Sequence, residues 1–417
     1  MVGEWRERQL AELTDNFDGI RVPVKEADRR PGPYPYYGAS GVVDHVDNYL
    51  FDGEYLLIAE DGENLRTRNT PVAFLAQGKF WVNNHAHIVR GNSEADTRFL
   101  MYALSAADIS GYLTGSTMPK LTQANLNRVP LLAPDDIHEQ RSIAHILGTL
   151  DDKIALNRRM SATLEAMAHA LFKSWFVDFG PVCAKAKGRN PGLPKSLADL
   201  FPARLVDSEL GEIPEGWEVG SVYAVADVIY GAPFSSARFN GDKVGEPLIR
   251  IRDLPGEAPG VWTPEIHPKG YKVHPGDIVV GMDGEFRAYL WGGAEGWLNQ
   301  RVCIFKPKSR SSAAFVRNAI IQPLADVEAT ETATTVIHLG KADIDRFKLV
   351  LPSSSVTDGF NAICQPWYDR IVAAKQEART LAALRDALLP KLISGELRTT
   401  NAERIVERVR EHTYERS

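Results

Sequence analysis

The sequence lacks the signals of a disulfide-stabilised, zinc-binding, membrane-spanning or secreted protein. Its three cysteines, Cys183, Cys303 and Cys364, lie far apart with no CxxC or His-Cys spacing, which argues against a disulfide framework and a zinc site. No run of about 18 apolar residues is present, so no transmembrane helix is expected. The first residues, MVGEWRERQL, form no apolar signal segment, and a cytoplasmic protein is expected.

Common catalytic motifs are also absent. The chain has no GxxxxGK[ST] phosphate loop, no Asn-Pro-Pro-aromatic tetrapeptide typical of a methyl-donor site, and no GxSxG nucleophile turn. Positive charge is scarce as well, because 48 basic residues face 54 acidic ones and the net charge is −6. Since free-standing nucleic-acid binders usually carry excess positive charge, this chain either binds no nucleic acid or binds it through local patches beside a partner's charge.

An internal duplication is the main feature that the sequence does contain. Residues 115–134 match residues 331–352 in pattern: a Thr-rich turn, an apolar residue, and then a strand that ends in proline. Leu126 and Ile344 occupy equivalent places, 218 residues apart. A long helical stretch follows each proline, so the chain contains a β-rich unit and a long helix, twice.

The duplication extends upstream more weakly. Residues 53–62 resemble residues 275–284, since both are apolar runs that end in Asp-Gly, and residues 80–89 resemble residues 296–305. Two copies are too few for a solenoid, so we expect a pseudo-two-fold α+β architecture with two β-rich α/β domains and two long helices. The expected parts are a first domain at 1–134, a long helix at 135–180, a surface connection at 181–216, a second domain at 217–352, a second helix at 353–397 and a frayed helix or tail at 398–417.

The two long helices are expected to pack on each other as a coiled coil. From Ile143 to Trp175, eight of ten residues spaced four and three apart are apolar, and a helix of about 40 residues spans about 60 Å. Asn157 either fixes the register of this seam or faces solvent where the seam drifts. Pro390 is expected to kink or end the second helix. The predicted packing residues are Ile143, Leu147, Leu150, Ile154, Asn157, Leu164, Leu171, Ile371, Leu381 and Leu388.

One group of residues loosely resembles a nuclease site. Asp61 and Glu63, followed by Lys79, imitate the carboxylates and lysine of metal-dependent nucleases. The second half keeps Asp283 and Glu285 without a corresponding lysine. Because Asp-Gly after an apolar strand is more simply a hairpin turn, the nuclease interpretation is the weaker alternative.

A second group, His85 and His87, has the alternation of a metal-binding pair. Both histidines would face one side of a strand, but no third ligand stands nearby in the sequence. Two hydrogen-bonded polar side chains are the commoner explanation of a lone His-x-His. No catalytic or metal-ligating residue is therefore assigned.

Basic and polar side chains near turns are the better candidates for binding. Arg66 and Arg68 follow the first Asp-Gly turn and Arg287 follows the second, while Arg250 and Arg252 are predicted on one face of a strand. Arginine can read guanine with two hydrogen bonds, whereas Lys, Ser, Thr and Tyr mostly hold phosphates. A solvated surface arginine remains the alternative for each. The DNA-binding candidates are Tyr36, Tyr37, Ser40, Arg66, Arg68, Thr117, Lys120, Arg250, Arg252 and Arg287.

The stretch GPYPYYGASG, residues 32–41, is expected to form a strand and a tight turn. Pro35 should lie at a sheet edge, since proline donates no hydrogen bond, and Gly38 and Gly41 should ease the turn. Tyr36 and Tyr37 point to opposite faces of a regular strand, so at most one of them reaches DNA. A structural role is favoured for this stretch.

Several of these motifs together resemble the DNA-specificity subunits of Type I restriction-modification enzymes. The resemblance rests on YPYYGASGVVD and FDGEYLLIAEDG in the first half, on EQRSIAHILGTLDDKIALN in the first helix, and on FPARLVDSELGEIPEGW and LLPKLISGEL later in the chain. The second unit is less similar and carries EPLIRIRDL in place of the tyrosine-glycine stretch.

The resemblance implies a non-catalytic chain that determines which DNA sequence the complex recognises. Each β-rich domain would read one half of a bipartite target in double-stranded DNA. The two long helices would be antiparallel, separate the domains, set the spacer and dock two modification subunits. Those subunits would bind S-adenosylmethionine and methylate adenine, while motor subunits, in systems that have them, would use ATP and Mg²⁺. The alternatives are a nuclease using Asp61, Glu63 and Lys79, and a helical scaffold that does not contact DNA.

Overall fold

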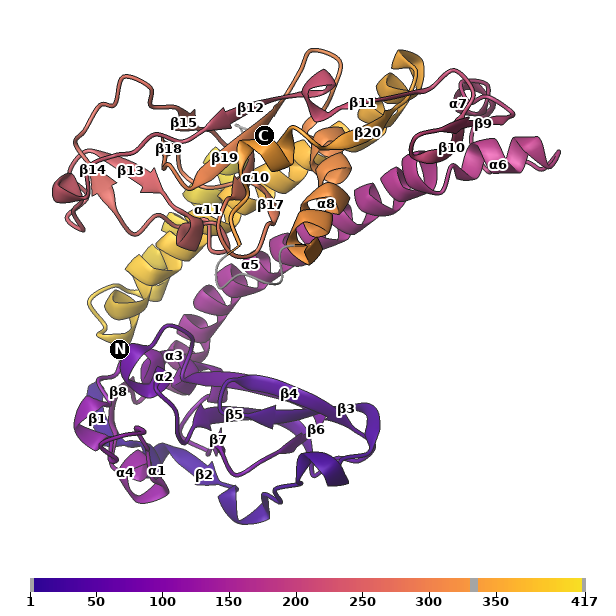
Figure 1. Ribbon diagram of the computed structural model, residues 1–417. Coiled ribbons are helices and arrows are strands. Elements are labelled where there is room, and N and C mark those ends of the chain that lie inside the picture. Colours follow the sequence, from indigo (N-terminus) through magenta and orange to yellow (C-terminus); the bar gives the residue numbers. More distant parts are fainter. Residues whose placement is uncertain (1–3, 331–336, 415–417) are drawn as a thin grey trace. The chain divides into compact units, whose positions relative to one another are not determined.

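The computed structural model describes residues 4–330 and 337–414, which divide between two compact units. Unit 1 is formed by residues 1–154 and 380–417, and unit 2 by residues 155–379. Both divisions fall inside long helices, α5 (Ile137–Phe172) and α10 (Ser354–Ile393), which are labelled in Figure 1. Each long helix therefore contributes one segment to each unit.

Unit 1 is built on a six-stranded sheet with the order β2-β7-β5-β6-β3-β4. Neighbouring strands are antiparallel except β3 and β6, which run parallel. Helix α3 (Thr97–Ala106) packs on β5 and β6, and the Asp96 side chain caps it by accepting from two backbone N–H groups. The strands are β2 (Thr14–Asn16), β3 (Pro31–Gly38), β4 (Gly41–Val46), β5 (Phe51–Ala59), β6 (Ala73–Val82) and β7 (Ala86–Gly91).

A two-stranded sheet, β1 (Trp5–Gln9) with β8 (Pro130–Pro134), leads into α5. Helix α11 (Thr399–Tyr414) completes unit 1, so the segment predicted as a frayed helix or tail is helical. Short helical turns connect the remaining elements of this unit: α1 (Leu10–Leu13), η1 (Asp18–Ile20), η2 (Glu26–Asp28), α2 (Asn64–Thr67), η3 (Ser110–Tyr112) and α4 (Gln123–Asn127).

A polar cluster ties the β-rich part of unit 1 to its helices. The Tyr102 hydroxyl on α3 donates to Asp151 Oδ2 on α5 at 2.6 Å. The Arg385 guanidinium on α10 donates to Asp151 Oδ1, also at 2.6 Å. Both carboxylate oxygens of Asp151 are therefore occupied, which fixes α3, α5 and α10 together at one point.

Unit 2 contains two four-stranded sheets, ordered β12-β19-β16-β17 and β14-β13-β18-β15. Helix α8 (Ala313–Thr330) packs on the first sheet, and an aromatic cluster that includes Phe172, Phe315 and Phe360 joins it to the long helices. The strands are β12 (Ala226–Tyr230), β13 (Glu246–Ile249), β14 (Trp262–Thr263), β15 (Lys272–Val273), β16 (Ile278–Gly281), β17 (Ala288–Leu290), β18 (Gly296–Leu298) and β19 (Val302–Pro307).

Two further strand pairs belong to unit 2, β9 (Leu205–Ser208) with β10 (Gly211–Pro214), and β11 (Glu218–Ser221) with β20 (Lys348–Leu351). The predicted surface connection at 181–216 contributes to the core instead, because Val182, Phe201 and Ile213 are buried. The Lys- and Gly-rich composition of this segment predicted a surface position, and its few apolar side chains are too widely spaced to indicate a core role. The other helical elements are η4 (Lys173–Val177), α6 (Gly180–Ala186), α7 (Lys195–Ala198), η5 (Val222–Ala224), η6 (Ser236–Arg238), η7 (Ile251–Asp253) and α9 (Lys341–Ile344).

The predicted duplication is visible in the strand order. The run β2-β7-β5-β6 in unit 1 has the same antiparallel order as β12-β19-β16-β17 in unit 2, and β1-β8 corresponds to β11-β20. Leu126 in α4 and Ile344 in α9 are both fully buried. The Thr-rich turn predicted at the start of the second copy, residues 331–336, lies outside the described residues.

The helical seam matches the predicted spacing. Of the ten predicted packing residues, Leu164 and Leu171 are partly buried and the other eight are buried. Asn157 on α5 donates to Glu377 on α10, so it faces the neighbouring helix and not solvent. Since Asp151 bonds Arg385 and Asn157 bonds Glu377, residue numbers fall along α10 as they rise along α5, and the helices run antiparallel. The α+β fold class is confirmed.

Helix α10 continues past Pro390 to Ile393, so the proline does not end it, and the expected kink stays a prediction. Two other local predictions fail for identifiable reasons. Asp61 is not in a hairpin turn, because the 13 residues between β5 and β6 include α2. Strand β3 is not at the sheet edge, since it lies between β6 and β4. Pro35 lies beyond the two residues that pair with β6, where a missing N–H is tolerated.

Within the two described ranges, no helix combines the length and the apolar character that crossing a membrane requires.

Candidate nucleic-acid interface

Three loops of unit 1 meet beside the end of β5. Glu60 donates its backbone N–H to the His85 carbonyl oxygen at 2.9 Å, and Leu121 donates to the Glu60 carbonyl oxygen at 2.8 Å. Gly62 donates to the Pro119 carbonyl oxygen at 3.1 Å. We call this arrangement of residues 60–62, 83–85 and 119–121 the first loop junction. It gathers segments far apart in sequence onto one backbone frame.

Unit 2 contains the same frame. Met282 donates to the Arg301 carbonyl oxygen at 2.9 Å, Leu339 donates to Met282 at 2.8 Å, and Gly284 donates to Ile337 at 3.1 Å. We call residues 282–284, 299–301 and 337–339 the second loop junction. The duplication therefore preserves not only the strands but also the junction at their ends.

The exposed side chains on the two junctions differ. His85 Nδ1 lies 2.7 Å from Asp61 Oδ2 at the first junction, whereas Arg301 Nη1 lies 3.6 Å from Asp283 Oδ1 at the second. The histidine and arginine side chains are each 54% exposed, and the two aspartates are 24% and 28% exposed. Each junction thus presents an exposed basic group held by a more buried carboxylate.

The third loop adds another basic residue in each case. Lys120 Nζ lies 3.2 Å from Glu60 Oε1 at the first junction. His338 occupies the equivalent place at the second and lies 2.7 Å from Asp283 through Nδ1. Arg301 Nη1 also lies 3.3 Å from His338 Nδ1, so Asp283 and His338 both lie at the Nη1 nitrogen of the guanidinium. The basic groups are suited to acceptors on bases or phosphates.

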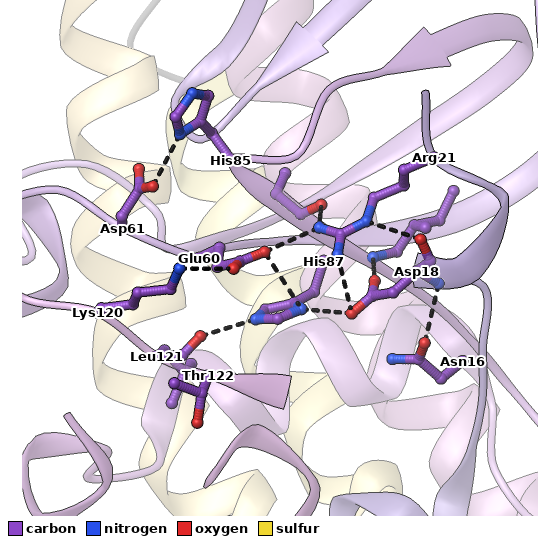
Figure 2. A network of polar contacts seen from close by, with 12 residues as sticks. Asn16, Asp18, Arg21, Glu60, Asp61, His85, His87, Lys120, Leu121 and Thr122 are labelled. Atoms are coloured by element: carbon purple, nitrogen blue, oxygen red, sulfur yellow. Dashed lines mark hydrogen bonds and ion pairs between the residues drawn. The ribbon is translucent and has the colours of Figure 1, made fainter. Parts of the chain in front are cut away.

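A buried polar network supports the first junction (Figure 2). His87 Nδ1 lies 2.6 Å from Asp18 Oδ2, and Nε2 lies 2.8 Å from the Leu121 carbonyl oxygen. Both ring nitrogens of His87 therefore face a partner within the protein. Arg21 donates to Glu60 Oε2 at 2.9 Å and lies 3.4 Å from Asp18. Through these contacts the buried network holds the Glu60 and Leu121 segments in place.

Both carboxyl groups of the network are ionised. Burial raises the pKa of Asp18, but hydrogen bonds from His87 and the Ile88 N–H outweigh it, and the pKa lies below its ordinary value. Burial likewise raises the pKa of Glu60, and the Arg21 hydrogen bond with the nearby charge of His87 again brings it below the ordinary value. The junction is therefore held by charge-assisted bonds at neutral pH.

The histidine pair accordingly has a structural and a surface member. His87 has no ring nitrogen left for a metal ion, whereas His85 points to Asp61 at the surface. Among the described residues, no group of three or more His, Cys, Asp or Glu side chains is placed to hold a metal ion.

The nuclease residues do not come together. Lys79 pairs with Asp52 near the start of β5, whereas Asp61 and Glu63 follow the other end of that strand, which stops at Ala59. Seven residues of strand separate the two ends, or more than about 20 Å. The geometry gives the nuclease alternative no support.

Eight of the ten predicted DNA-binding residues fall into two groups. Tyr36, Arg68 and Arg250 are turned toward protein: Tyr36 is 1% exposed, Arg68 donates to the Ser105 carbonyl oxygen, and Arg250 pairs with Asp253 at 3.0 Å. The strand predicted for Arg250 and Arg252 is wrong, because Asp253 bonds the Arg250 backbone N–H and closes the turn η7. Ser40, Thr117, Lys120, Arg252 and Arg287 are exposed and stay predictions.

Arg66 and Tyr37 have intermediate roles. Arg66 donates to the Gly115 carbonyl oxygen at 2.8 Å and so braces the loop that carries Thr117. Tyr37 is half-buried against Phe74 and Phe80. These contacts give both residues a structural role, and contact of either residue with DNA stays a prediction.

The tyrosine stretch has a counterpart in unit 2. Tyr36 and Tyr37 pair with Trp81 and Val82 of the parallel strand β6, just as Leu248 and Ile249 pair with Trp297 and Leu298 of β18. Leu248 and Ile249 are fully buried. Like Tyr36, they pack in the core, so the C-terminal end of this strand contributes buried side chains in both domains.

Sequence reasoning missed His85, Arg301 and His338 as interface residues. The signal was available, because aligning residues 80–89 with 296–305 places His85 opposite Arg301. It was overlooked because His85 was considered only as a metal ligand. The contact of Asp283 with both Arg301 and His338 is long-range and had no sequence signal.

Comparison with known proteins identifies relatives of the whole chain. Residues 3–166 match the family described as Type I restriction modification DNA specificity domain. The chain is 25% identical to the Type I restriction enzyme MjaIX specificity subunit of Methanocaldococcus jannaschii, over 95% of this chain and 94% of that protein. It is 31% identical to the Type I restriction enzyme EcoBI specificity subunit of Escherichia coli, over 48% of this chain and 44% of that protein.

A solved structure shares the fold. The S subunit of a Type-I restriction-modification system from M. genitalium superposes with a TM-score of 0.59 at 14% identity, covering 94% of this chain and 96% of that one. The match spans both units of the present chain.

Proposed function

We propose that the chain reads a bipartite DNA target through its two loop junctions, because residues 3–166 match the Type I DNA specificity domain family and the chain is similar over 95% of its length to a Type I specificity subunit. The resemblance drawn from the motifs is thereby confirmed. The relatives support a DNA-recognition role for this chain.

One observation carries the assignment of the reading surface. The two junctions share three backbone hydrogen bonds of equal length, yet present His85 and Lys120 in one domain and Arg301 and His338 in the other. A constant frame with different exposed side chains is what two related surfaces need in order to read two different half-sites. A plain structural duplication would have no reason to keep the basic groups exposed.

We propose the chain's part in the larger assembly from its resemblance to specificity subunits and from its composition. We assign no catalytic step to it. Modification subunits, two of them, bind the long helices, bind S-adenosylmethionine and methylate adenine. Motor subunits, in systems that have them, use ATP and Mg²⁺. The net charge of −6 fits this division, because phosphate contacts come largely from the partner subunits.

The long helices set the spacing of the two half-sites. With 36 and 40 residues, α5 and α10 are about 54 and 60 Å long. The apolar seam and the Asn157–Glu377 contact keep them in one register. The assembly acts on DNA inside the cell, as a cytoplasmic host-defence complex.

Methylome sequencing tests this function. The chain is co-expressed with a modification subunit in a host without other adenine methyltransferases, and methylated adenines are mapped. One split motif with a fixed spacer is expected. A continuous motif, or no methylation by an assembled complex that is soluble, contradicts the proposal.

A second measurement separates DNA reading from the scaffold alternative. The assembled complex is titrated with target DNA between about 50 and 200 mM salt, where affinity falls by orders of magnitude if several phosphates are contacted. Affinity that does not depend on salt, or that is equal for DNA and unrelated polyanions, would favour a scaffold.

A further inference from the structure

We propose that Arg301 and His85 are equivalent base-reading residues, and that Arg301 reads a guanine in the second half-site while His85 reads its own half-site with a single hydrogen bond. The inference deepens the function proposed above and rests on it. It assigns a specificity role to two side chains that the sequence did not single out.

The backbone places both residues at the same point of their domains. Asn83 donates its N–H to the Tyr37 carbonyl oxygen at 3.0 Å, and Asn299 donates to the Ile249 carbonyl oxygen at 3.1 Å. Two residues later, the carbonyl oxygens of His85 and Arg301 accept the junction bonds described above. Each residue therefore lies between two fixed backbone hydrogen bonds, at the same place of the frame in both domains.

The partner carboxylate orients each group. Asp283 lies against Nη1 of Arg301, and neither Nε nor Nη2 makes a hydrogen bond within the described ranges. Nε–H and Nη2–H lie on one edge of the planar guanidinium and point the same way. That edge matches the O6 and N7 acceptors that guanine shows in the major groove.

His85 has only one nitrogen to offer. Its Nδ1 is held by Asp61, which leaves Nε2 for an outside partner. A single nitrogen cannot make the paired contact that an arginine makes with guanine, so discrimination at this position of the first half-site is weaker. The two half-sites are therefore read unequally at equivalent positions.

A base fits this site better than a phosphate does. The Asp283 carboxylate lies 3.6 Å from the guanidinium and only 28% of it is exposed, so it repels a phosphate that approaches the same cation. The guanine edge carries no net charge and avoids that penalty. A simple surface ion pair would also explain the 3.6 Å contact, but such pairs are weak and leave the outer edge of the arginine unused.

The experiment uses the full complex and the target that its methylome reveals. Affinity is measured for the cognate duplex and for duplexes in which each second-half guanine is replaced in turn. Arg301→Gln is expected to lower cognate affinity roughly 5- to 150-fold and to abolish discrimination at one guanine only. His85→Gln should alter preference in the first half-site alone.

Two further variants keep the result interpretable. Arg301→Lys retains the charge but not the paired donors, so it should lose discrimination at the same guanine. Arg204→Gln removes an exposed, ion-paired arginine from the same unit and should leave every preference unchanged. Unfolding midpoints of all variants establish that the domain remains folded.

Three outcomes would overturn the inference. Equal loss for all sequences would make Arg301 a phosphate contact, and unchanged affinity would make it a structural ion pair. A second half-site that contains no guanine on either strand would also refute it. In each case the unmodified complex still recognises a split target, whereas failure of the proposed function would appear as absent sequence preference before any substitution.

Discussion

Asn157 of α5 donates its side-chain N–H to Glu377 of α10 at 2.8 Å, within a seam that is mostly apolar. The Asn157 Oδ1 atom is buried and has no hydrogen-bond partner among the described residues. A buried amide satisfied on one side only costs stability, and such a group persists in coiled coils when it selects a register.

Replacing this polar pair should separate stability from register. In the double variant Asn157→Leu with Glu377→Leu, the free energy of unfolding is expected to rise by about 1 kcal/mol, because the buried amide is removed. The spacer of the methylated motif should at the same time become less uniform. Urea unfolding and methylome mapping measure the two effects. A more stable protein with an unchanged spacer would show that the pair has no register role.

Tyr36 should contribute to stability and not to DNA reading. Its hydroxyl accepts from the Val24 N–H at 3.0 Å and donates to the Val24 carbonyl oxygen at 3.3 Å, inside unit 1. Tyr36→Phe is therefore expected to lower the free energy of unfolding by about 1–2 kcal/mol and leave the target motif intact. Tyr37→Phe is the matched control and should have little effect on either. Altered base preference in Tyr36→Phe would contradict this assignment.

The network below the first junction predicts acid sensitivity of unit 1. The pKa values of Asp18 and Glu60 are lowered in the folded state, so their stabilisation is present above the ordinary carboxyl pKa of about 4 and is lost as pH falls through the folded values. Asp18→Asn should destabilise the protein at pH 7, and the difference from the unmodified protein should shrink toward about pH 3. Asp15→Asn, at an exposed position nearby, should show no such trend in urea unfolding.

Asp151 should be the most sensitive position of the cluster that joins the helices to the β-rich part of unit 1. Asp151→Ala leaves the Tyr102 hydroxyl and the Nη1 donor of Arg385 without their acceptor, and is expected to cost about 2–3 kcal/mol. Tyr102→Phe removes one bond and no charge and should cost less. Equal costs for the two variants in denaturant titrations would show that the carboxylate is replaced by solvent.

Two neighbouring arginines of unit 2 should behave differently. Arg250 is half-buried against Asp253 and bonds it through Nε and Nη2, so Arg250→Ala should lower stability. Arg252 is exposed, and Arg252→Ala should leave the unfolding midpoint unchanged while weakening DNA binding. Thermal unfolding and DNA titration of both variants distinguish the roles, and the reverse pattern would reject this division.

Periodic features of the sequence predicted the fold well. The seam from Ile143 to Leu171 follows from helix geometry, since residues four and three apart share one face. The equivalence of Leu126 and Ile344 followed from their spacing. These predictions succeeded because they depend on local geometry that every copy of a helix or strand repeats.

Predictions that depend on which side chains meet were less successful. The assignment of Arg250 to a strand failed because Asp253 captures its backbone N–H three residues away, an interaction that competes with strand formation. The junction of Glu60 with Leu121 joins residues about sixty apart in sequence, and no local pattern signals it. The site could therefore be placed near the turns but not assembled.

The division of the chain between the two units has a consequence for its synthesis. Unit 2 is one continuous segment, residues 155–379, whereas unit 1 combines residues 1–154 with residues 380–417. The ribosome therefore releases everything that unit 2 needs before the last helix segments of unit 1 exist. Residues 1–154 are synthesised first, but unit 1 cannot complete its packing until residues 380–417 have been added. Unit 2, although its synthesis begins later, can therefore finish folding first.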